Sequence, residues 1–167
     1  MTDLAGRRAV VTGGASGIGA ATATILAERG ADVLIADRDE TIGRVTADGI
    51  GADFIALDVT DAAAWDRIGP VDFAHLSAGT MTRLEPCSID DLTASNWRRV
   101  HDVNVEGVVN GILALVPGMK ARGGGSIVVM GSLAAFVGFG ADPFYAATKA
   151  TLVNLARSLA EPLGSVG

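Results

Sequence analysis

The fold of this chain can be inferred outward from Arg8-Ala9-Val10-Val11-Thr12-Gly13-Gly14-Ala15-Ser16-Gly17-Ile18-Gly19. The first part of this stretch is a short apolar run rich in β-branched residues, which predicts a buried strand. The glycines that follow allow a tight turn and a close approach of the main chain to a ligand. The segment 20–29 then predicts a helix, and Gly30 is placed to cap its C-terminal end.

A strand, a glycine turn and a helix in this order are typical of a site that binds a dinucleotide. The free N–H groups and the positive dipole end of the helix would hold the pyrophosphate. The residues of the turn that we expect to contact the cofactor are Gly13, Ser16, Gly17, Ile18 and Gly19. The alternative is an ordinary tight turn in which the glycines serve packing alone.

A second apolar run, 32–36, ends at Asp37, which lies about 20 residues after the glycine turn, as the dinucleotide motif requires. A carboxylate at this position accepts hydrogen bonds from both hydroxyls of the adenosine ribose and would repel a 2′-phosphate. The sequence therefore favours NAD over NADP as the cofactor. Arg38 is the one residue that could accommodate a phosphate instead.

Tyr145 and Lys149 are four positions apart, a spacing that places both side chains on one face of a helix. A nearby ammonium lowers the pKa of a phenol from its usual value of about 10. A phenol tuned in this way can exchange a proton with an alcohol or a ketone near neutral pH. The alternative is a tyrosine ring that packs in the core while the lysine stays in solvent.

Composition limits the classes of function. A chain of 167 residues has the length of one domain, and a net charge of −6 argues against binding to nucleic acid. The single cysteine, Cys87, allows neither an intramolecular disulfide nor a zinc cluster, as expected in a reducing compartment. No signal peptide and no apolar run of membrane-spanning length is visible. We therefore expect a soluble cytoplasmic protein.

Strand and helix signals alternate along the chain, which predicts an α/β fold with a three-layer, doubly wound parallel sheet. We expect strands at 8–12, 32–36, 53–57, 71–76 and 126–131, and helices at 17–29, 39–47, 62–67, 95–121 and 144–162. Trp65 should pack its short helix onto the sheet. His75 is expected to be a core residue with its hydrogen bonds satisfied, and His101 has no partner at metal-ligand spacing.

Taken together, these motifs resemble those of the short-chain dehydrogenase/reductase family, NAD(P)-dependent oxidoreductases with a Rossmann fold. The matching segments follow the order of the family along the whole chain: Thr12 to Gly19, Leu57-Asp58-Val59, Ser77-Ala78-Gly79, Asn104-Val105-Glu106-Gly107, Gly131-Ser132, and Tyr145 with Lys149. The resemblance implies hydride transfer between NAD and a secondary alcohol or ketone. It also implies that Asp58 binds the adenine amino group, that Val59 touches the adenine ring, and that residues 77–79 contact the cofactor.

The same resemblance assigns the catalytic roles. Ser132 would orient the substrate oxygen, and Tyr145 would be the acid–base. Lys149 would bind the nicotinamide ribose and tune the tyrosine, and Asn104 would hold a water that continues a proton relay from the lysine.

The chain departs from the family pattern in two places. Ser77 stands where the family commonly has asparagine, and a small loss of stability is expected because serine cannot bridge neighbouring strands as an amide does. Family members also continue beyond the position of Gly167, with further strands and a loop that covers the substrate. We therefore expect residues 1–167 to form one dinucleotide-binding domain, truncated at its C-terminus. The rival hypothesis is a catalytically incompetent nucleotide-binding or interaction protein of this fold.

The segment from Ala134 to Phe144 should line one wall of the active site. Its aromatic residues favour an apolar substrate if they face the site, with Met81 and Leu84 adding to that wall, and otherwise they serve core or interface packing: Phe136, Phe139 and Phe144. The substrate itself cannot be read from these residues.

The helices at 95–121 and 144–162 are apolar on most sides, and such helices are buried on most sides. The second helix has a stripe for its own sheet, formed by Leu152, Leu155, Ala156 and Leu159, and further small apolar residues lie off that stripe. Family resemblance also points to these two helices as an interface between subunits. We therefore expect a homodimer or homotetramer. The alternative is burial of the surplus face by a C-terminal segment of the same chain.

Overall fold

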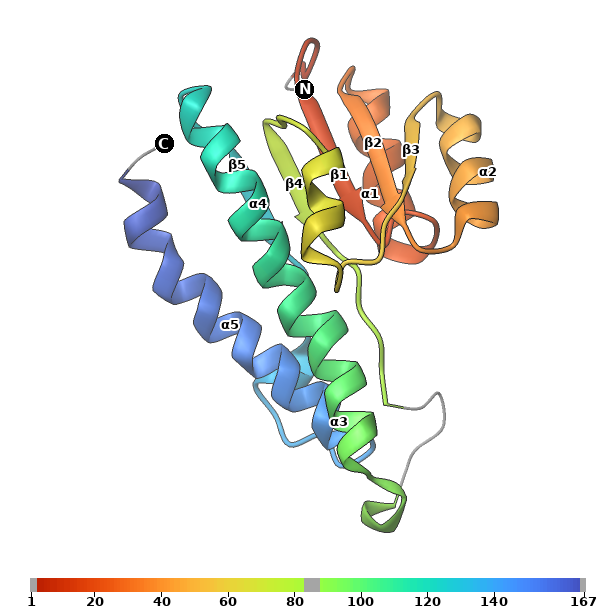
Figure 1. Ribbon diagram of the computed structural model, residues 1–167, viewed down its shortest axis with the longest axis vertical. Helices are drawn as coiled ribbons and strands as arrows, with labels where there is room; N and C mark the ends of the chain where they lie inside the picture. Colours follow the sequence, from red (N-terminus) through yellow and green to blue (C-terminus); the bar gives the residue numbers. More distant parts are fainter. Residues whose placement is uncertain (1–2, 83–87, 166–167) are drawn as a thin grey trace.

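The apolar run after Arg7 forms the central strand of a parallel sheet. The structure is a computed structural model that describes residues 3–82 and 88–165. Its strand order is β3-β2-β1-β4-β5, so the chain crosses over after β3 to the other side of β1 (Figure 1). The strands are β1 (Arg8–Thr12), β2 (Asp32–Asp37), β3 (Asp53–Ala56), β4 (Phe73–Leu76) and β5 (Ser126–Val129).

Helices cover both faces of this sheet, which confirms the three-layer doubly wound fold. On one face, α1 (Gly17–Glu28) and α2 (Glu40–Ile50) bury a small apolar cluster against β1 and β2. The larger core lies on the other face, beneath the 3₁₀ helix η1 (Ala62–Arg67) and the helices α4 (Gly107–Ala121) and α5 (Pro143–Gly164). The short η2 (Ile89–Asp91) precedes α3 (Ala94–His101), and η4 (Leu133–Ala135) follows β5.

The helix predicted at 95–121 differs from the observed one. It begins at Ala94 and contains one wide π-helical segment, η3 (Asp102–Glu106), between α3 and α4. A π segment adds a residue to the helical turn, and such bulges often occur at functional sites. Asn104 lies in this segment and is completely buried.

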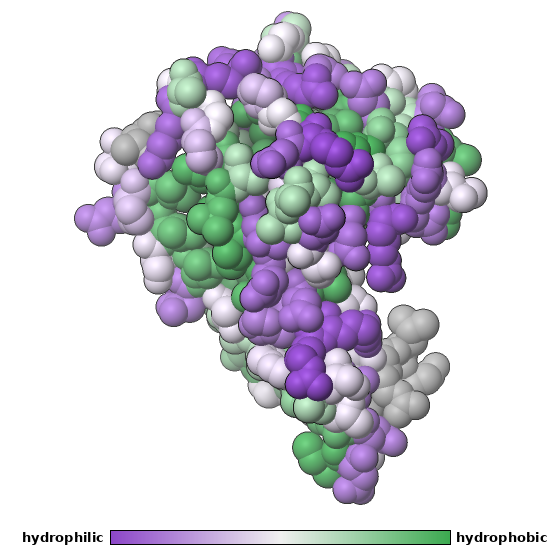
Figure 2. Space-filling model, viewed as in Figure 1, coloured by the Kyte–Doolittle hydropathy of each residue, from purple (hydrophilic) through white to green (hydrophobic). Residues whose placement is uncertain are grey.

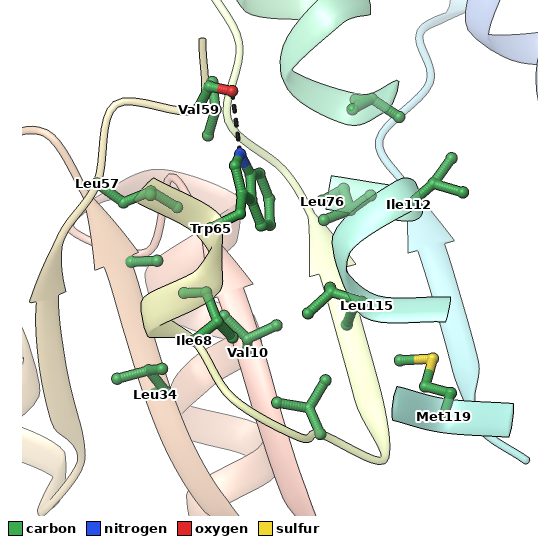
Figure 3. Close-up of a cluster of buried hydrophobic side chains, with 14 of the residues drawn as sticks. Val10, Leu34, Leu57, Val59, Trp65, Ile68, Leu76, Ile112, Leu115 and Met119 are labelled. Carbon is green, nitrogen blue, oxygen red and sulfur yellow. Dashed lines mark hydrogen bonds between the residues drawn. The ribbon is translucent and has the colours of Figure 1, made fainter. Parts of the chain in front are cut away.

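Trp65 packs η1 onto the sheet, as predicted, and it also makes a polar contact. Its ring is almost fully buried in the larger core, and its indole N–H donates to the backbone oxygen of Val59 at 3.1 Å (Figure 3). The side-chain amide of Asn110 donates to the same oxygen at 3.1 Å. Two side chains from different elements therefore fix the main chain at Val59.

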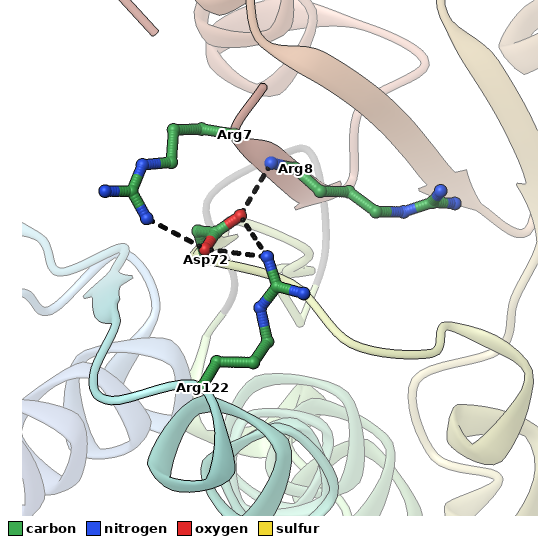
Figure 4. A network of polar contacts seen from close by, with 4 residues as sticks. All are labelled: Arg7, Arg8, Asp72 and Arg122. Carbon is green, nitrogen blue, oxygen red and sulfur yellow. Dashed lines mark hydrogen bonds and ion pairs between the residues drawn. The ribbon is translucent and has the colours of Figure 1, made fainter. Parts of the chain in front are cut away.

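Asp72 forms a polar cluster at the N-terminal ends of the strands. It precedes β4, which begins at Phe73 rather than at the predicted residue 71. Its carboxylate accepts the backbone N–H of Arg8 at 2.8 Å and the guanidinium groups of Arg7 and Arg122 at 3.2 and 3.1 Å (Figure 4). The backbone N–H of Arg8 and the flanking arginines hold the pKa of this buried carboxyl below its usual value, against the opposing effect of burial.

His75, on β4, contradicts one expectation. The side chain is buried as predicted, but its Nδ1 has no hydrogen-bond partner among the described residues. Burial lowers the pKa of this imidazole, so the neutral form is favoured. His75 is therefore a core residue with one buried ring nitrogen, Nδ1, that lacks a partner among the described residues.

An apolar groove lies between the C-terminal halves of α4 and α5 and the edge strand β5. Figure 2 shows green, hydrophobic side chains gathered over this part of the molecule. Ala156, expected on the buried stripe of α5, is instead exposed and lines the groove, whereas Leu152 is buried and Leu155 and Leu159 pack against the core. Among residues 3–82 and 88–165, no helix has both the length and the apolar character needed to cross a bilayer. The cellular compartment stays a prediction.

Candidate active site

The residues predicted to bind the cofactor meet at the carboxyl ends of the parallel strands. A cavity of about 470 Å³ lies there, lined by segments that follow β1, β2, β3 and β4. In open α/β sheets, ligands bind at this edge where the strand order reverses. Except for Gly17, the predicted residues of these segments all line the cavity: Gly13, Ser16, Ile18, Gly19, Asp37, Arg38, Asp58, Val59, Ser77, Ala78 and Gly79.

The glycine turn leaves no room for side chains at two of its positions. Gly13 has a positive φ of 66°, and a Cβ there would lie 2.9 Å from the main chain of Ala78. A Cβ on Gly19 would overlap the backbone oxygen of Gly13. The side chain of Ser16, the N-cap of α1, makes no capping hydrogen bond within the described part of the chain. The N-terminal N–H groups of α1 therefore remain available to an anion.

Two acidic side chains border this cavity where β2 and β3 end. Asp37 accepts hydrogen bonds from the backbone N–H groups of Ala15 and Asp39, each at 3.0 Å, so its carboxylate is fixed beside the glycine turn. Asp58 accepts the backbone N–H and the hydroxyl of Thr60, and these two bonds lower the pKa of its carboxyl. Both carboxylates are thus held in defined orientations.

A second cavity, of about 500 Å³, holds the predicted acid–base pair. Tyr145 and Lys149 line it together with residues 79–82 and Arg99. It shares Ser77, Gly79, Thr80 and Met130 with the cavity at the glycine turn. The two predicted functions therefore occupy adjoining spaces.

Lys149 is buried rather than in solvent, contrary to the alternative interpretation of the motif. Its side chain is 3% exposed, and its Nζ donates to the backbone oxygen of Met130 at 2.8 Å and lies 5.7 Å from the centre of the Tyr145 ring. Burial lowers the pKa of this ammonium below 10.5. Within residues 3–82 and 88–165, no ion pair involves Lys149.

Asn104 lies beside this pair and ties two elements together. Its amide accepts from the backbone N–H of Thr80 at 2.7 Å and donates to the backbone oxygen of Thr80 at 2.9 Å and to the hydroxyl of Thr148 at 3.0 Å. A Cβ on Gly79 would lie 3.3 Å from Asn104 Oδ1 and 3.6 Å from Lys149 Nζ. Both polar atoms therefore border the same small space.

Ser132, like Gly17 and Asn104, is a predicted residue that lines neither cavity. It precedes η4, where its hydroxyl accepts the backbone N–H of Ala134 at 3.2 Å. The aromatic residues nearby are divided in their contacts. Phe139 packs edge-on against Tyr145, and Phe144 packs against Trp97, whereas Phe136 is 62% exposed.

Several residues of this site were missed in the sequence analysis. Trp65 and Asn110 hold Val59, and Thr148 completes the hydrogen bonds of Asn104. Arg99 and Asp142 hold the segment that leaves β4. Only Asp142 carried a local signal, because an acidic residue before proline is typical of a helix start.

Other expectations from the sequence concern metals and residues outside the structure. The described residues contain no group of three or more potential ligands that could hold a metal ion. His101 instead packs against Trp97 with the two rings tilted by 41°, and Asp102 lies 3.6 Å from its Nδ1. Leu84 and Cys87 lie outside the described residues.

Comparison with known proteins identifies the family. The sequence model of the short chain dehydrogenase family matches residues 7–167. The trans-4-hydroxycyclohexanecarboxylate dehydrogenase of Sinomonas cyclohexanicum is 38% identical, over 96% of this chain and 68% of its own length. The NADP-dependent (R)-specific alcohol dehydrogenase of Lentilactobacillus kefiri is 35% identical, over 96% of this chain and 68% of its own. A solved short chain dehydrogenase/reductase family protein superimposes with a TM-score of 0.92 at 38% identity, covering 99% of this chain and 72% of that one. The chain belongs to this family.

Proposed function

We propose that this short-chain dehydrogenase transfers a hydride between NAD and a secondary alcohol or ketone, with Tyr145 as the acid–base. The observation that carries the proposal is the placement of Tyr145 and buried Lys149 in a cavity that adjoins the cavity at the glycine turn. In the oxidative direction the alcohol carbon loses a hydride, and its hydroxyl loses a proton to the phenolate of Tyr145. In the reductive direction the phenol returns that proton to the carbonyl oxygen.

The cavities fit a nicotinamide dinucleotide, the cofactor type of the family. At positions 13 and 19 of the glycine turn the main chain packs too closely for any Cβ, and the first turn of α1 presents free N–H groups to a pyrophosphate. The nicotinamide ring supplies the hydride acceptor or donor. The residues of this chain bind and orient it: we assign the ribose of the adenosine to Asp37, the adenine to Asp58 and Val59, and the ribose of the nicotinamide to Lys149.

Lys149 and Asn104 support the proton transfer in this proposal. The ammonium is desolvated, and the described part of the chain pairs it with no carboxylate, so its charge acts on the neighbouring phenol across a medium of low dielectric. Asn104 Oδ1 borders the same space as Lys149 Nζ, where a bound water would continue the proton relay. Ser132 would orient the substrate oxygen after a change of the η4 segment or of its own rotamer.

NAD rather than NADP is the cofactor that we propose. The carboxylate of Asp37 is fixed by two backbone N–H groups at the edge of the cavity, where a 2′-phosphate would be repelled. The relative from Lentilactobacillus kefiri is NADP-dependent, so family membership alone does not choose between the two. Asp37→Ala should narrow the preference for NAD, because Arg38 can then meet the phosphate. Tighter binding of NADP than of NAD by the unsubstituted protein would contradict the assignment.

The names of the relatives suggest a first set of substrates. Curated relatives include dehydrogenases of trans- and cis-4-hydroxycyclohexanecarboxylate, so secondary alcohols on a six-membered ring are the compounds to assay first. The cavity that holds Tyr145 and Lys149, which we call the catalytic cavity, has a mixed lining. The polar side chains of Thr80, Thr82 and Arg99 lie there beside Met81 and Met130. None of Phe136, Phe139 and Phe144 lines it, so these aromatics give no support to an apolar substrate.

The test of the proposed function is Tyr145→Phe. The ring would still pack against Phe139, but the transferable proton would be gone. We expect kcat to fall by about 10²–10⁴-fold while the affinity for NAD, measured by calorimetry, stays within about twofold. Near-normal kcat in the variant would refute the role of Tyr145. NAD binding without turnover of any alcohol by the unsubstituted protein would favour the rival, a catalytically incompetent nucleotide-binding protein.

We also propose a homodimer or homotetramer that forms through α3, α4 and α5. Leu113 on the outer face of α4 is 69% exposed, and Ala147 and Ala150 are exposed on α5. Exposed apolar side chains on these helices suit packing against the helices of a second subunit. Light scattering that shows a monomer at micromolar concentration would contradict this proposal.

A further inference from the structure

Asp142 is one of the few charged residues buried in this protein. It is 2% exposed and lies one residue before α5, where it accepts the backbone N–H of Tyr145 at 3.0 Å. Its carboxylate also accepts the backbone N–H and the hydroxyl of Thr82, both at 2.6 Å. An ordinary helix cap needs only the first of these bonds. The contacts with Thr82 therefore point to a second task.

Thr82 belongs to the segment that leaves the carboxyl end of β4 and lines the catalytic cavity. In Figure 1 this segment runs from β4 toward the N-terminal ends of α3 and α5. Other side chains hold the same segment: Asn104 binds the backbone of Thr80, and the guanidinium of Arg99 donates to the backbone oxygens of Met81 and Thr82. The segment 80–82 is thus held by α3, by the π segment and by Asp142.

Tyr145 depends on this arrangement because of its place in α5. It is the third residue of the helix, and the N–H groups of the first turn have no acceptor within a helix. Pro143 contributes no N–H at all. The backbone of Tyr145 is therefore held by Asp142, and Asp142 is in turn held by Thr82. One turn further on, Asn104 joins Thr80 to Thr148.

We propose that Asp142 is a positioning residue that links the first turn of α5 to segment 80–82 and so places the phenol of Tyr145 in the catalytic cavity. We call the two hydrogen bonds between Asp142 and Thr82 the α5 latch. The proposal rests on the proposed function, since it gives Tyr145 its geometry. Burial of the carboxylate is compensated by three hydrogen bonds, two of them to a residue that borders the substrate space.

Four variants separate the α5 latch from ordinary capping. Asp142→Ser keeps a good N-cap but loses the paired contacts with Thr82. Thr82→Val removes the hydroxyl arm of the latch, and Thr82→Ser retains it. Asp61→Ser is the matched control, because Asp61 caps η1 through Ala63 and Ala64 and lies outside both cavities.

The measurements are kcat and KM of the full chain with NAD and a cyclic secondary alcohol, and the ultraviolet difference spectrum of the phenol. Tyr145 is the single tyrosine of the sequence, so the surroundings of its ring can be followed without substrate. We expect Asp142→Ser to lower kcat by about tenfold or more with little change in the affinity for NAD. The ultraviolet difference spectrum of the phenol should change in the same variant, because the ring moves relative to its neighbours in the cavity.

Thr82→Val should show the fall in kcat and the change in the phenol spectrum to a smaller degree. Thr82→Ser keeps the hydroxyl and should behave like wild type. The Asp61→Ser control should lose thermal stability with no change in kcat or in the phenol spectrum. The proposal is overturned if Asp142→Ser changes only thermal stability, as the control does. If Asp142→Ser does not fold, equal kcat and equal phenol spectra in Thr82→Val and Thr82→Ser overturn it. Retained activity in Tyr145→Phe would instead refute the proposed function, whereas an inactive Tyr145→Phe beside a normal Asp142→Ser would refute the latch alone.

Discussion

Asp72→Asn tests how much the polar cluster at the N-terminal edge of the sheet stabilises the fold. Removing one partner from a buried ion pair costs about 3–5 kcal/mol. The Arg7 and Arg122 side chains are 60% and 44% exposed, so solvent screens their share, and the buried bond from the Arg8 N–H dominates. We therefore expect a loss of about 2–3 kcal/mol in the free energy of unfolding, or roughly 5–10 °C in Tm.

Urea unfolding followed by the fluorescence of Trp65, which is buried, measures this loss at pH 7 and at lower pH. The folded-state pKa of Asp72 is lowered, so its stabilisation is present above the usual value of 3.8 and is lost as the pH falls through the folded-state pKa. The gap between wild type and variant should therefore narrow below about pH 4. Asp53→Asn is the control, because that carboxylate is 67% exposed and lies 3.9 Å from Arg8. A gap below about 0.5 kcal/mol at pH 7, or one that does not change with pH, would refute the reasoning.

Three further predictions concern single residues. Gly13→Ala should abolish NAD binding in calorimetry, because its Cβ would press on the main chain of Ala78. The control is Gly49→Ala, in open space on α2, which should leave NAD binding intact and stabilise the fold by up to about 1 kcal/mol. We expect wild type to lose stability as the pH falls below about 6.5, because the unfolded chain binds a proton that buried His75 resists. His75→Leu should remove that loss, and an unchanged pH profile of urea unfolding would contradict this prediction. Trp65→Phe should cost about 1–2 kcal/mol and weaken NAD binding, because the Val59 oxygen would lose one of its two side-chain donors; unaltered affinity would argue against that coupling.

The sequence predicted those features whose causes are local. The strand and glycine turn around Gly13 follow from adjacent residues, and the order of strands and helices follows from alternating signals. The wide turn at Asn104 could not be predicted, because an apolar pattern of this kind is compatible with a regular helix and with one that contains an extra residue. His75 sits in an apolar strand in either case, and only the folded structure shows that its Nδ1 lacks a partner among the described residues.

The missed site residues act across long separations in the chain. The Asp-Pro pair at 142–143 marks the start of a helix, but nothing near it indicates Thr82, 60 positions away. Arg99 and Thr80 are 19 positions apart and meet only because α3 lies beside the segment that leaves β4. Such contacts depend on which loops share the same edge of the sheet, and a single sequence does not carry that information.

The two edges of the sheet use buried carboxylates in different ways. Asp72 joins the start of β1 to the segment before β5 through Arg8 and Arg122 (Figure 4). It lies at the end of the strands opposite both cavities. Asp142 binds loops at the carboxyl edge, where a small displacement moves the phenol of Tyr145. Because catalytic geometry is more sensitive to small displacements than folding stability is, equal losses of stability at the two carboxylates should have unequal effects on turnover. The location of a buried charge, rather than its burial, therefore decides whether it serves the fold or the reaction.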